Sequence, residues 1–264
     1  MPYVVSVSAV CPMRRDASHK SEMVSQLLFG EPGEILEDGK DFTKIKCLYD
    51  DYEGWCAKSQ LAETDDIIAL NPVAFTKEKN ATAWLNHTIV PLSLATPVFA
   101  KVSLDKYTIG FDEDVLLQED KGETLLPSVG ELAVKYLNTP YLWGGKSSVG
   151  IDCSGFTQQV LKMMGIKLMR DAYQQATQGE VVGFLEEVIP GDLAFFDNEE
   201  GRITHAGILL NSDTIIHASG YVRVDKIDSQ GIIHSYTGKR THTLRIIKRM
   251  ATPPPPSDRS SGRA

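Results

Sequence analysis

The sequence predicts an α+β protein with small β-barrels in its N-terminal half and a mixed helix-and-sheet domain in its C-terminal half. Short apolar runs separated by glycines fill residues 1–118, a pattern typical of small barrels. After residue 128 the apolar residues follow a helical period, and after residue 190 they return to strand-like runs. This order of elements predicts an antiparallel sheet with helices packed on it.

The bulk composition is that of an ordinary globular protein and argues against some partners. The chain has 264 residues, is 42% hydrophobic and 23% charged, and carries a formal net charge of −8. Nucleic acids and anionic membranes bind basic surfaces, so we expect neither as the main partner. No apolar run approaches the roughly 20 residues of a membrane helix. Residues 1–16 lack the basic start of an export signal, so we expect a cytoplasmic protein if residue 1 is the native start.

The N-terminal half divides into two β-rich segments. We expect a first barrel over residues 1–62, a second β-rich segment over 63–118 and a charged, turn-rich linker over 119–128. No internal repeat is apparent, so a second barrel is inferred from length alone. The strands expected in these segments are residues 3–10, 25–29, 34–38, 43–49, 54–63, 81–85, 88–94, 96–103 and 106–111.

The C-terminal domain is expected over residues 129–250. A first amphipathic helix spans 129–137 and ends before Pro140, and a second spans 153–164 and ends at Gly165. Strands are expected at 190–197, 203–210, 213–219 and 241–250. Residues 251–264 contain four consecutive prolines followed by small polar and charged residues, which predicts a disordered tail without catalytic content.

Four cysteines occur, and none belongs to a CxxC pair or a metal-finger spacing. In a reducing compartment we expect all of them to be free thiols. Three fall within strand-like runs, where a small buried side chain is the usual role of cysteine: Cys11, Cys47 and Cys56.

Cys153 stands in a different setting, directly after the glycine-rich stretch that begins at Gly144. It starts a helical pattern, and the partial positive charge of a helix N-terminus lowers the pKa of a thiol. Asp152 and Ser154 can cap the first N–H groups of that helix. Cys153 is therefore a candidate nucleophile, and its own backbone N–H is a candidate oxyanion donor.

A nucleophilic thiol needs a base, and His205 and His217 lie in two consecutive strand-like runs. If residues 211–213 form the turn, Gly207 pairs with His217, and both histidines share one face of the hairpin because strand side chains alternate. A two-residue turn would separate them unless a bulge intervened. We assign His205 as the base and His217 as the residue that orients it.

The same three residues could instead form a zinc site, since zinc accepts cysteine and histidine ligands. No fourth ligand or supporting carboxylate is apparent in the spacing, so we expect no metal and no organic cofactor. The remaining histidines are expected to be structural or exposed, with His234 the first exception: His19, His87, His234 and His242.

Five motifs together resemble the NlpC-type cell-wall cysteine peptidases, which are papain-like. They are PYLWGGKSSVGIDCSGF, RDAYQQ, PGDLAFF, THAGILL and IIHASG, and they occur in the family's order between residues 125 and 248. Residues 1–62, with SHKSEMVSQLLFGE and DDYEGWC, resemble the bacterial SH3-like barrels of peptide-recycling members. The resemblance implies a papain-like domain behind one or two SH3-like barrels.

The resemblance also implies roles for particular residues. Cys153 matches the nucleophile, His205 the base and His217 the third polar residue of the family, while Tyr141 matches a tyrosine near the oxyanion site. Asp171 matches an acidic residue that holds a free substrate amine. The family often carries a serine next to it, and this chain has Ala172. The other predicted substrate-binding residues are Asp152 and Ser154 beside the nucleophile and Glu22 and Tyr52 in the barrel.

By this resemblance the substrate is a small peptide, a murein stem peptide. The expected reaction is hydrolysis between γ-D-glutamate and a diamino acid, in fragments with a free N-terminal L-alanine, during cell-wall recycling. Two alternatives stay open: a wall-peptide binding module with a degenerate peptidase domain, and an amide acyltransferase on the same fold. The oligomeric state is not predicted.

Overall fold

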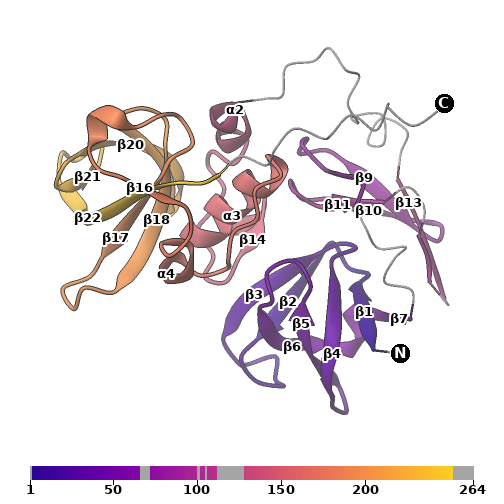
Figure 1. The fold of residues 1–264 in the computed structure, drawn as a ribbon. Coiled ribbons are helices and arrows are strands. Elements are labelled where there is room, and N and C mark those ends of the chain that lie inside the picture. Colours follow the sequence, from indigo (N-terminus) through magenta and orange to yellow (C-terminus); the bar gives the residue numbers. More distant parts are fainter. Residues whose placement is uncertain (1, 66–71, 100–101, 105, 112–127, 252–264) are drawn as a thin grey trace, which may run out of the picture.

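The computed structural model describes residues 2–65, 72–99, 102–104, 106–111 and 128–251. These residues form an N-terminal barrel, a smaller β-rich segment beside it, and a C-terminal domain whose helices lie between its own sheet and the barrel (Figure 1). The expected linker over 119–128 and the expected tail over 251–264 lie outside the described residues, except for Ser128 and Ala251.

The N-terminal barrel is a seven-stranded antiparallel sheet with the strand order β3-β2-β6-β5-β4-β1-β7. Its strands are β1 (Tyr3–Ser6), β2 (Val10–Arg14), β3 (Met23–Leu28), β4 (Pro32–Asp38), β5 (Phe42–Cys47), β6 (Glu53–Ala57) and β7 (Leu61–Thr64), and a 3-10 turn (Lys58–Gln60) joins the last two. Free, buried Cys11, Cys47 and Cys56 pack in its core, which confirms the role predicted for them.

One strand of this barrel differs from the expectation. Residues 3–10 were expected as a single strand, but the chain bends after Ser6 and enters β2 only at Val10. The bend has a physical reason: β1 pairs with β4 and β7, whereas β2 pairs with β3 and β6 on the other side of the sheet. The apolar run 3–10 therefore contributes residues to two different strands of the barrel, β1 and β2.

The second β-rich segment is a four-stranded sheet in the order β10-β9-β13-β12 with a separate two-stranded pair, β11-β8. Its strands are β8 (Ala74–Phe75), β9 (Thr82–Leu85), β10 (Thr88–Pro91), β11 (Pro97–Val98), β12 (Val102–Leu104) and β13 (Tyr107–Phe111). The expected strand 96–103 is thus divided between two sheets. Phe99 of this segment packs against Val5 and Phe29 of the barrel in one shared core.

The sheet of the C-terminal domain closes into a barrel, because β21 at one edge also pairs with β22, the strand next to the other edge. Its strands are β16 (Glu180–Val182), β17 (Leu193–Asp197), β18 (Ile203–Leu209), β19 (Thr214–Ser219), β20 (Tyr221–Asp228), β21 (Gly231–Ile233) and β22 (Arg240–Arg249). The four strands expected from the sequence are β17, β18, β19 and β22. The other three were missed, and β20 is the longest of them.

The helices are α2 (Val129–Val134), α3 (Cys153–Met163) and α4 (Ala172–Gln175), with a short hairpin of β14 (Lys146–Ser147) and β15 (Gly150–Ile151) and a 3-10 turn (Leu185–Glu187). Helix α2 ends earlier than expected, because the chain turns at Asn138, whose φ is 65°, and reaches Pro140. Gly165, with a φ of 75°, follows α3 as expected.

Helix α3 is buried on every side, although its pattern predicted only one apolar face. Phe156 and Val160 pack in the core between α2 and the sheet. The opposite, polar face is also buried, and its Gln158, Gln159 and Lys162 are covered. The polar face is covered because the N-terminal barrel docks on it.

Buried ion pairs hold the barrel against α3. Glu31 of the barrel lies 2.5 Å from Nζ of Lys162 and 3.3 Å from Nζ of Lys146, and all three side chains are almost fully buried. The amide of Gln158 donates to Asp50 of the barrel at 3.0 Å. Burial alone would raise the pKa of Glu31, but the two ammonium groups lower it from 4.5 to about 2. The carboxylate therefore stays ionised inside the interface.

We predict that Glu31→Gln destabilises the protein by about 3 kcal/mol at pH 7, because it removes the counter-ion of the buried Lys162 and leaves the buried Lys146 with only Asp50, at 3.9 Å. Since the folded-state pKa of Glu31 is depressed, its stabilising contribution is present above about pH 4.5 and is lost as the pH falls towards 2. Chemical denaturation at several pH values measures both effects.

The matched control is Glu34→Gln, which removes a partly exposed carboxylate that pairs with Lys46 at 3.3 Å. An exposed pair of this kind contributes less than about 1 kcal/mol. Equal destabilisation by the two substitutions, or an effect of Glu31→Gln that does not shrink at low pH, would contradict the assignment of Glu31 to the docking interface.

Candidate active site

The candidate nucleophile sits at the first position of α3, as the sequence predicted. Asp152 is the N-cap, and its Oδ1 accepts the N–H of Gly155 at 2.6 Å. The Sγ of Cys153 lies 3.9 Å from the carbonyl oxygen of Thr204, the residue that precedes His205. The thiol therefore contacts the strand that carries the predicted base.

Two glycines allow the backbone to pack closely around this helix start. A Cβ on Gly155 would lie 2.2 Å from the carbonyl oxygen of Gly145, a distance that no side chain tolerates. Gly144 has a φ of 74°, and a Cβ there would lie 2.5 Å from the carbonyl oxygen of Met23 in the barrel. The glycine-rich stretch thus brings both the helix and the barrel against the loop before Cys153.

The carboxylate of Asp152 is held by a buried arginine that the sequence did not single out. Nη2 of Arg170 lies 2.6 Å from Asp152 Oδ2, and Nη1 lies 3.1 Å from Oδ1 and 3.0 Å from Ser154 Oγ. The Nε of Arg170 reaches Ser25 of the barrel at 3.1 Å. The side chains of Asp152 and Ser154 are therefore already hydrogen-bonded within the protein, and the prediction that they bind substrate stays a prediction.

The two predicted histidines meet on one face of the β18–β19 hairpin. Gly207 pairs with His217, and the N–H of Leu210 bonds to the carbonyl of Thr214, so the connecting loop is 211–213 as expected. His205 Nε2 lies 2.8 Å from His217 Nδ1. A Cβ at Gly207 would lie 2.9 Å from Cβ of His217, so glycine leaves the space for the histidine pair.

A carboxylate lies behind His217, although none was apparent in the sequence spacing. Asp225 Oδ2 lies 3.1 Å from His217 Nε2, and the Asp225 side chain is 1% exposed. Arg223 Nε and the N–H of Ser235 donate to the same carboxylate at 2.8 and 2.9 Å. The signal for Asp225 is the alternating pattern of β20, a strand that the sequence reading missed.

His242, expected to be structural or exposed, packs against the histidine pair, where its ring has a structural role. Its ring stacks on that of His205 with a centroid distance of 4.1 Å and an interplanar angle of 21°. Phe196 packs against both rings. Burial lowers the pKa of His242 to about 4, so a neutral ring covers His205 near pH 7.

The protonation states differ from the sequence prediction. Burial raises the pKa of the Cys153 thiol to about 12, and the neighbouring Asp152 adds to this rise, whereas a lowered pKa was expected. Burial together with His217 and His242 lowers the pKa of His205 well below its usual value. The resting site therefore holds a neutral thiol and a neutral imidazole. The imidazole can take the thiol proton as Cys153 attacks.

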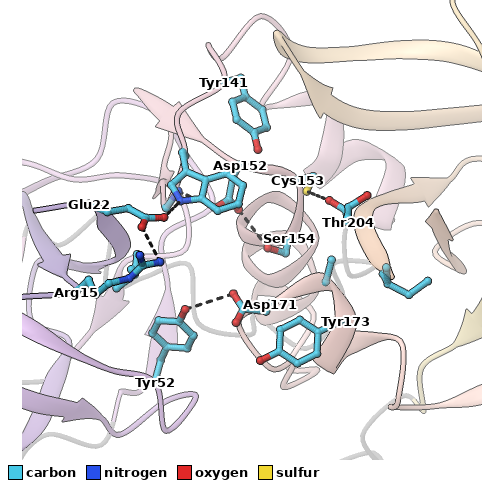
Figure 2. Close-up of a pocket in the computed structure, with 15 residues that line it drawn as sticks. Arg15, Glu22, Tyr52, Tyr141, Asp152, Cys153, Ser154, Asp171, Tyr173 and Thr204 are labelled. Carbon is cyan, nitrogen blue, oxygen red and sulfur yellow. Dashed lines mark hydrogen bonds and ion pairs between the residues drawn. The ribbon is translucent and has the colours of Figure 1, made fainter. Parts of the chain in front are cut away.

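A cavity of about 470 Å³ opens beside Cys153, between the C-terminal domain and the barrel (Figure 2). The predicted residues that line it are Glu22, Tyr52, Tyr141, Asp152, Cys153, Ser154 and Asp171. His205 and His217 are not among the residues that line it. The hydroxyl of Tyr141 points towards Cys153, which agrees with its predicted position near the oxyanion site.

The barrel residues reach across the cavity to the C-terminal domain. Tyr52 donates its hydroxyl to Asp171 Oδ1 at 3.4 Å, and Trp143 donates its indole N–H to Glu22 at 2.7 Å (Figure 2). Glu22 also pairs with Arg15 at 2.6 Å. The sequence reading missed Arg15 and left the role of Trp143 open. Both line the cavity.

Two features are absent from the described part of the chain. None of its helices is long and apolar enough to cross a membrane. Among the same residues, no group of three or more His, Cys, Asp or Glu side chains is arranged to hold a metal ion.

We predict that Gly207→Ala disturbs the histidine pair, because the added Cβ would lie 2.7 Å from Ile215 and 2.9 Å from His217. Such overpacking destabilises a protein by about 1–3 kcal/mol. We expect iodoacetamide to alkylate Cys153 at pH 7 more slowly in this variant than in the wild type. Mass spectrometry of the alkylated protein measures the rate. The matched control is Gly183→Ala, where the Cβ meets only Glu187 at 3.5 Å. Unchanged alkylation in Gly207→Ala would contradict this role of the glycine.

Comparison with known proteins identifies two domains in the chain. Residues 138–241 match the NlpC/P60 family, and residues 13–61 match the bacterial dipeptidyl-peptidase SH3 domain. The chain is 32% identical to the gamma-D-glutamyl-L-lysine dipeptidyl-peptidase of Bacillus subtilis over 63% of its own length. It is 25% identical to the protein of the same name from Bacillus cereus over 84% of its length. The alignments span 60% and 70% of those two relatives.

The fold has a solved counterpart. An NlpC/P60 family protein from Bacillus cereus superposes with a TM-score of 0.75 at 19% identity, covering 95% of this chain and all of that structure. The predicted α+β fold, a papain-like domain behind an SH3-like barrel, is thereby confirmed. This chain carries an NlpC/P60 family domain preceded by a bacterial SH3 domain.

Proposed function

We propose that this protein hydrolyses peptidoglycan stem peptides at the bond between γ-D-glutamate and the diamino acid, and that it prefers fragments with a free N-terminal L-alanine. The observation that carries the proposal is the cavity beside Cys153, whose far wall is built by the barrel. Its volume lies within the range of about 300–1,000 Å³ typical of small-molecule sites. The Bacillus relatives named for γ-D-glutamyl-L-lysine cleavage support the bond chosen.

The hydrolysis follows from the geometry around the thiol. Sγ of Cys153 attacks the γ-carbonyl carbon while His205 accepts its proton, and the oxyanion meets the N–H of Cys153 at the start of α3, where no intrahelical acceptor is available. Tyr141 lies beside it. Protonated His205 then gives its proton to the leaving amine of the diamino acid, which leaves an acyl-enzyme. Water, deprotonated by His205, releases the dipeptide and restores the thiol.

Asp171 is the group we assign to the substrate's ammonium. It is half-buried and lines the cavity, and burial raises the pKa of its carboxyl while Arg170 opposes the rise. Glu22 pairs with Arg15 and accepts a hydrogen bond from the indole N–H of Trp143, so its charge is balanced within the protein. Glu22 therefore forms part of the cavity wall, and we assign the negative charge that faces the substrate ammonium to Asp171. Ala172 offers no hydroxyl, so the amine forms one fewer hydrogen bond than a serine there would allow.

The closed wall also supports a role in recycling. A glycan or acyl group on the alanine nitrogen would remove the positive charge and meet the barrel side chains at this end of the cavity. Soluble peptide fragments released from the wall fit the site, and intact wall does not. We accordingly place the reaction in the cytoplasm, on fragments taken up for reuse.

The decisive experiment is mass spectrometry of L-Ala-γ-D-Glu-L-Lys digests with free and N-acetylated termini. We expect the free peptide to yield L-Ala-γ-D-Glu and lysine with the wild type and nothing with Cys153→Ala. Equal cleavage of the acetylated peptide would refute the free-amine preference. Activity that persists in Cys153→Ala would refute the thiol mechanism. Transfer of the dipeptide to an added amine, in place of hydrolysis, would show an acyltransferase.

We predict that Asp171→Asn lowers kcat/KM for the free-amine peptide by about 10- to 100-fold, because a charge-assisted hydrogen bond contributes about 1.5–3 kcal/mol. The N-acetylated peptide carries no ammonium, so its low rate should stay the same and serves as the control within one variant. Steady-state kinetics with both peptides measures the ratio. A parallel loss for both would contradict recognition of the amine by Asp171.

A further inference from the structure

Buried side chains linked by hydrogen bonds run from His205 to His217 and continue to a carboxylate, that of Asp225. His205, His217 and Asp225 come from three neighbouring strands, β18, β19 and β20, and are 6%, 0% and 1% exposed. The nitrogen–nitrogen distance between the rings is 2.8 Å, and the distance from His217 Nε2 to Asp225 Oδ2 is 3.1 Å. We infer that Asp225 is a positioning residue that acts through His217 to determine which ring nitrogen of His205 is basic.

The first step is the charge of Asp225. Burial raises the pKa of this carboxyl, but the hydrogen bonds from His217 and from the N–H of Ser235, together with the charge of Arg223, lower it below its usual value. Two of these partners, the Nε–H of Arg223 and the N–H of Ser235, are donors that cannot act as acceptors. An ionised carboxylate only accepts hydrogen bonds, so Nε2 of His217 must carry a proton.

The second step follows along the chain of hydrogen bonds. A neutral imidazole has one N–H, so a proton on His217 Nε2 leaves its Nδ1 as an acceptor. That acceptor faces His205 Nε2 at 2.8 Å, which must therefore be the protonated nitrogen of His205. The Nδ1 of His205 is left without a proton. This ring nitrogen is therefore the one available to take the proton of Cys153, whose Sγ lies 3.9 Å from the carbonyl oxygen of Thr204, the residue before His205.

The opposite placement of the protons on the two histidines shows why the carboxylate matters. If His217 carried its proton on Nδ1, it would donate to His205, and Nδ1 of His205 would hold the proton instead. His205 could not then act as the base. The tautomer of a buried histidine is set by the hydrogen bond that its other ring nitrogen makes, and for His217 that bond is to Asp225. The remaining charged or titratable groups around the chain are His242 on the ring of His205, and Arg223 and His234 towards His217.

The test uses the full-length protein and needs no substrate. It rests on the proposed function only in taking Cys153 as the reacting group. Long-range ¹H–¹⁵N spectra report imidazole tautomers directly, and we expect the wild type to show both His205 and His217 protonated on Nε2. A wild-type spectrum with His205 protonated on Nδ1 would overturn the inference, whatever any variant does.

The variant is Asp225→Asn, which keeps the size of the side chain and removes its charge. The amide NH2 replaces either Oδ2, which faces His217 and Arg223, or Oδ1, which faces the N–H of Ser235, so at least one N–H meets a donor. Without the negative charge, and with a donor able to face His217, the preference for a proton on His217 Nε2 weakens. We expect mixed tautomers of both histidines and alkylation of Cys153 by iodoacetamide slowed about 10- to 100-fold. Wild-type tautomers and an unchanged alkylation rate in this variant would overturn the inference.

The matched control is Asp192→Asn. Asp192 is also a buried aspartate of the C-terminal domain, and it accepts two hydrogen bonds from Arg249, at 2.8 and 2.7 Å, away from the histidines. We expect this substitution to lower stability and leave the tautomers and the alkylation rate unchanged. If it slowed alkylation as much as Asp225→Asn does, the effect would be one of general stability and the inference would fail. Absence of peptide cleavage by the wild type would count against the proposed function alone.

Discussion

The ion pair between Asp152 and Arg170 is the interaction on which the rest of the site depends. One carboxylate caps α3 through Gly155, accepts the N–H of Gly144 and receives two hydrogen bonds from the guanidinium. The candidate nucleophile follows Asp152 in the chain, and Asp171, which we propose binds the substrate amine, follows Arg170. Both ions are buried, so each would be strongly destabilising without the other. The pair therefore sets the separation between the reacting thiol and the far end of the cavity.

The barrel belongs to the active site as much as the domain that carries the thiol. Arg170 extends the central ion pair to Ser25, and the buried Glu31 cluster fastens the barrel to the polar face of α3. With the barrel docked, Tyr52 meets Asp171 and Glu22 meets Trp143. The end of the cavity at Asp171 is thus built by the interface between two domains, whereas Cys153, His205 and His217 come from one domain.

The predictions that succeeded rest on local rules of chain geometry. An aspartate before a helical pattern predicts a cap, and the spacing of His205 and His217 across a short turn predicts a shared face. The missed features depend on neighbours far away in the sequence. β20 was missed because its inner face carries Arg223 and Asp225 in place of apolar residues. The burial of the polar face of α3 was missed because the residues that cover it belong to the barrel, far away in the sequence.

The sequence by itself determined the candidate nucleophile and its two candidate histidines, because these follow from residue order and from periods of two and 3.6. It indicated the family through five motifs in matching order. Only the tertiary structure decided the protonation of the thiol, the stacking of His242, the carboxylate behind His217 and the wall that closes the cavity. The physical reason is burial. Desolvation and charge pairing depend on what surrounds a group, and Cys153 and Glu31 obtain those surroundings from segments more than a hundred residues apart in the chain.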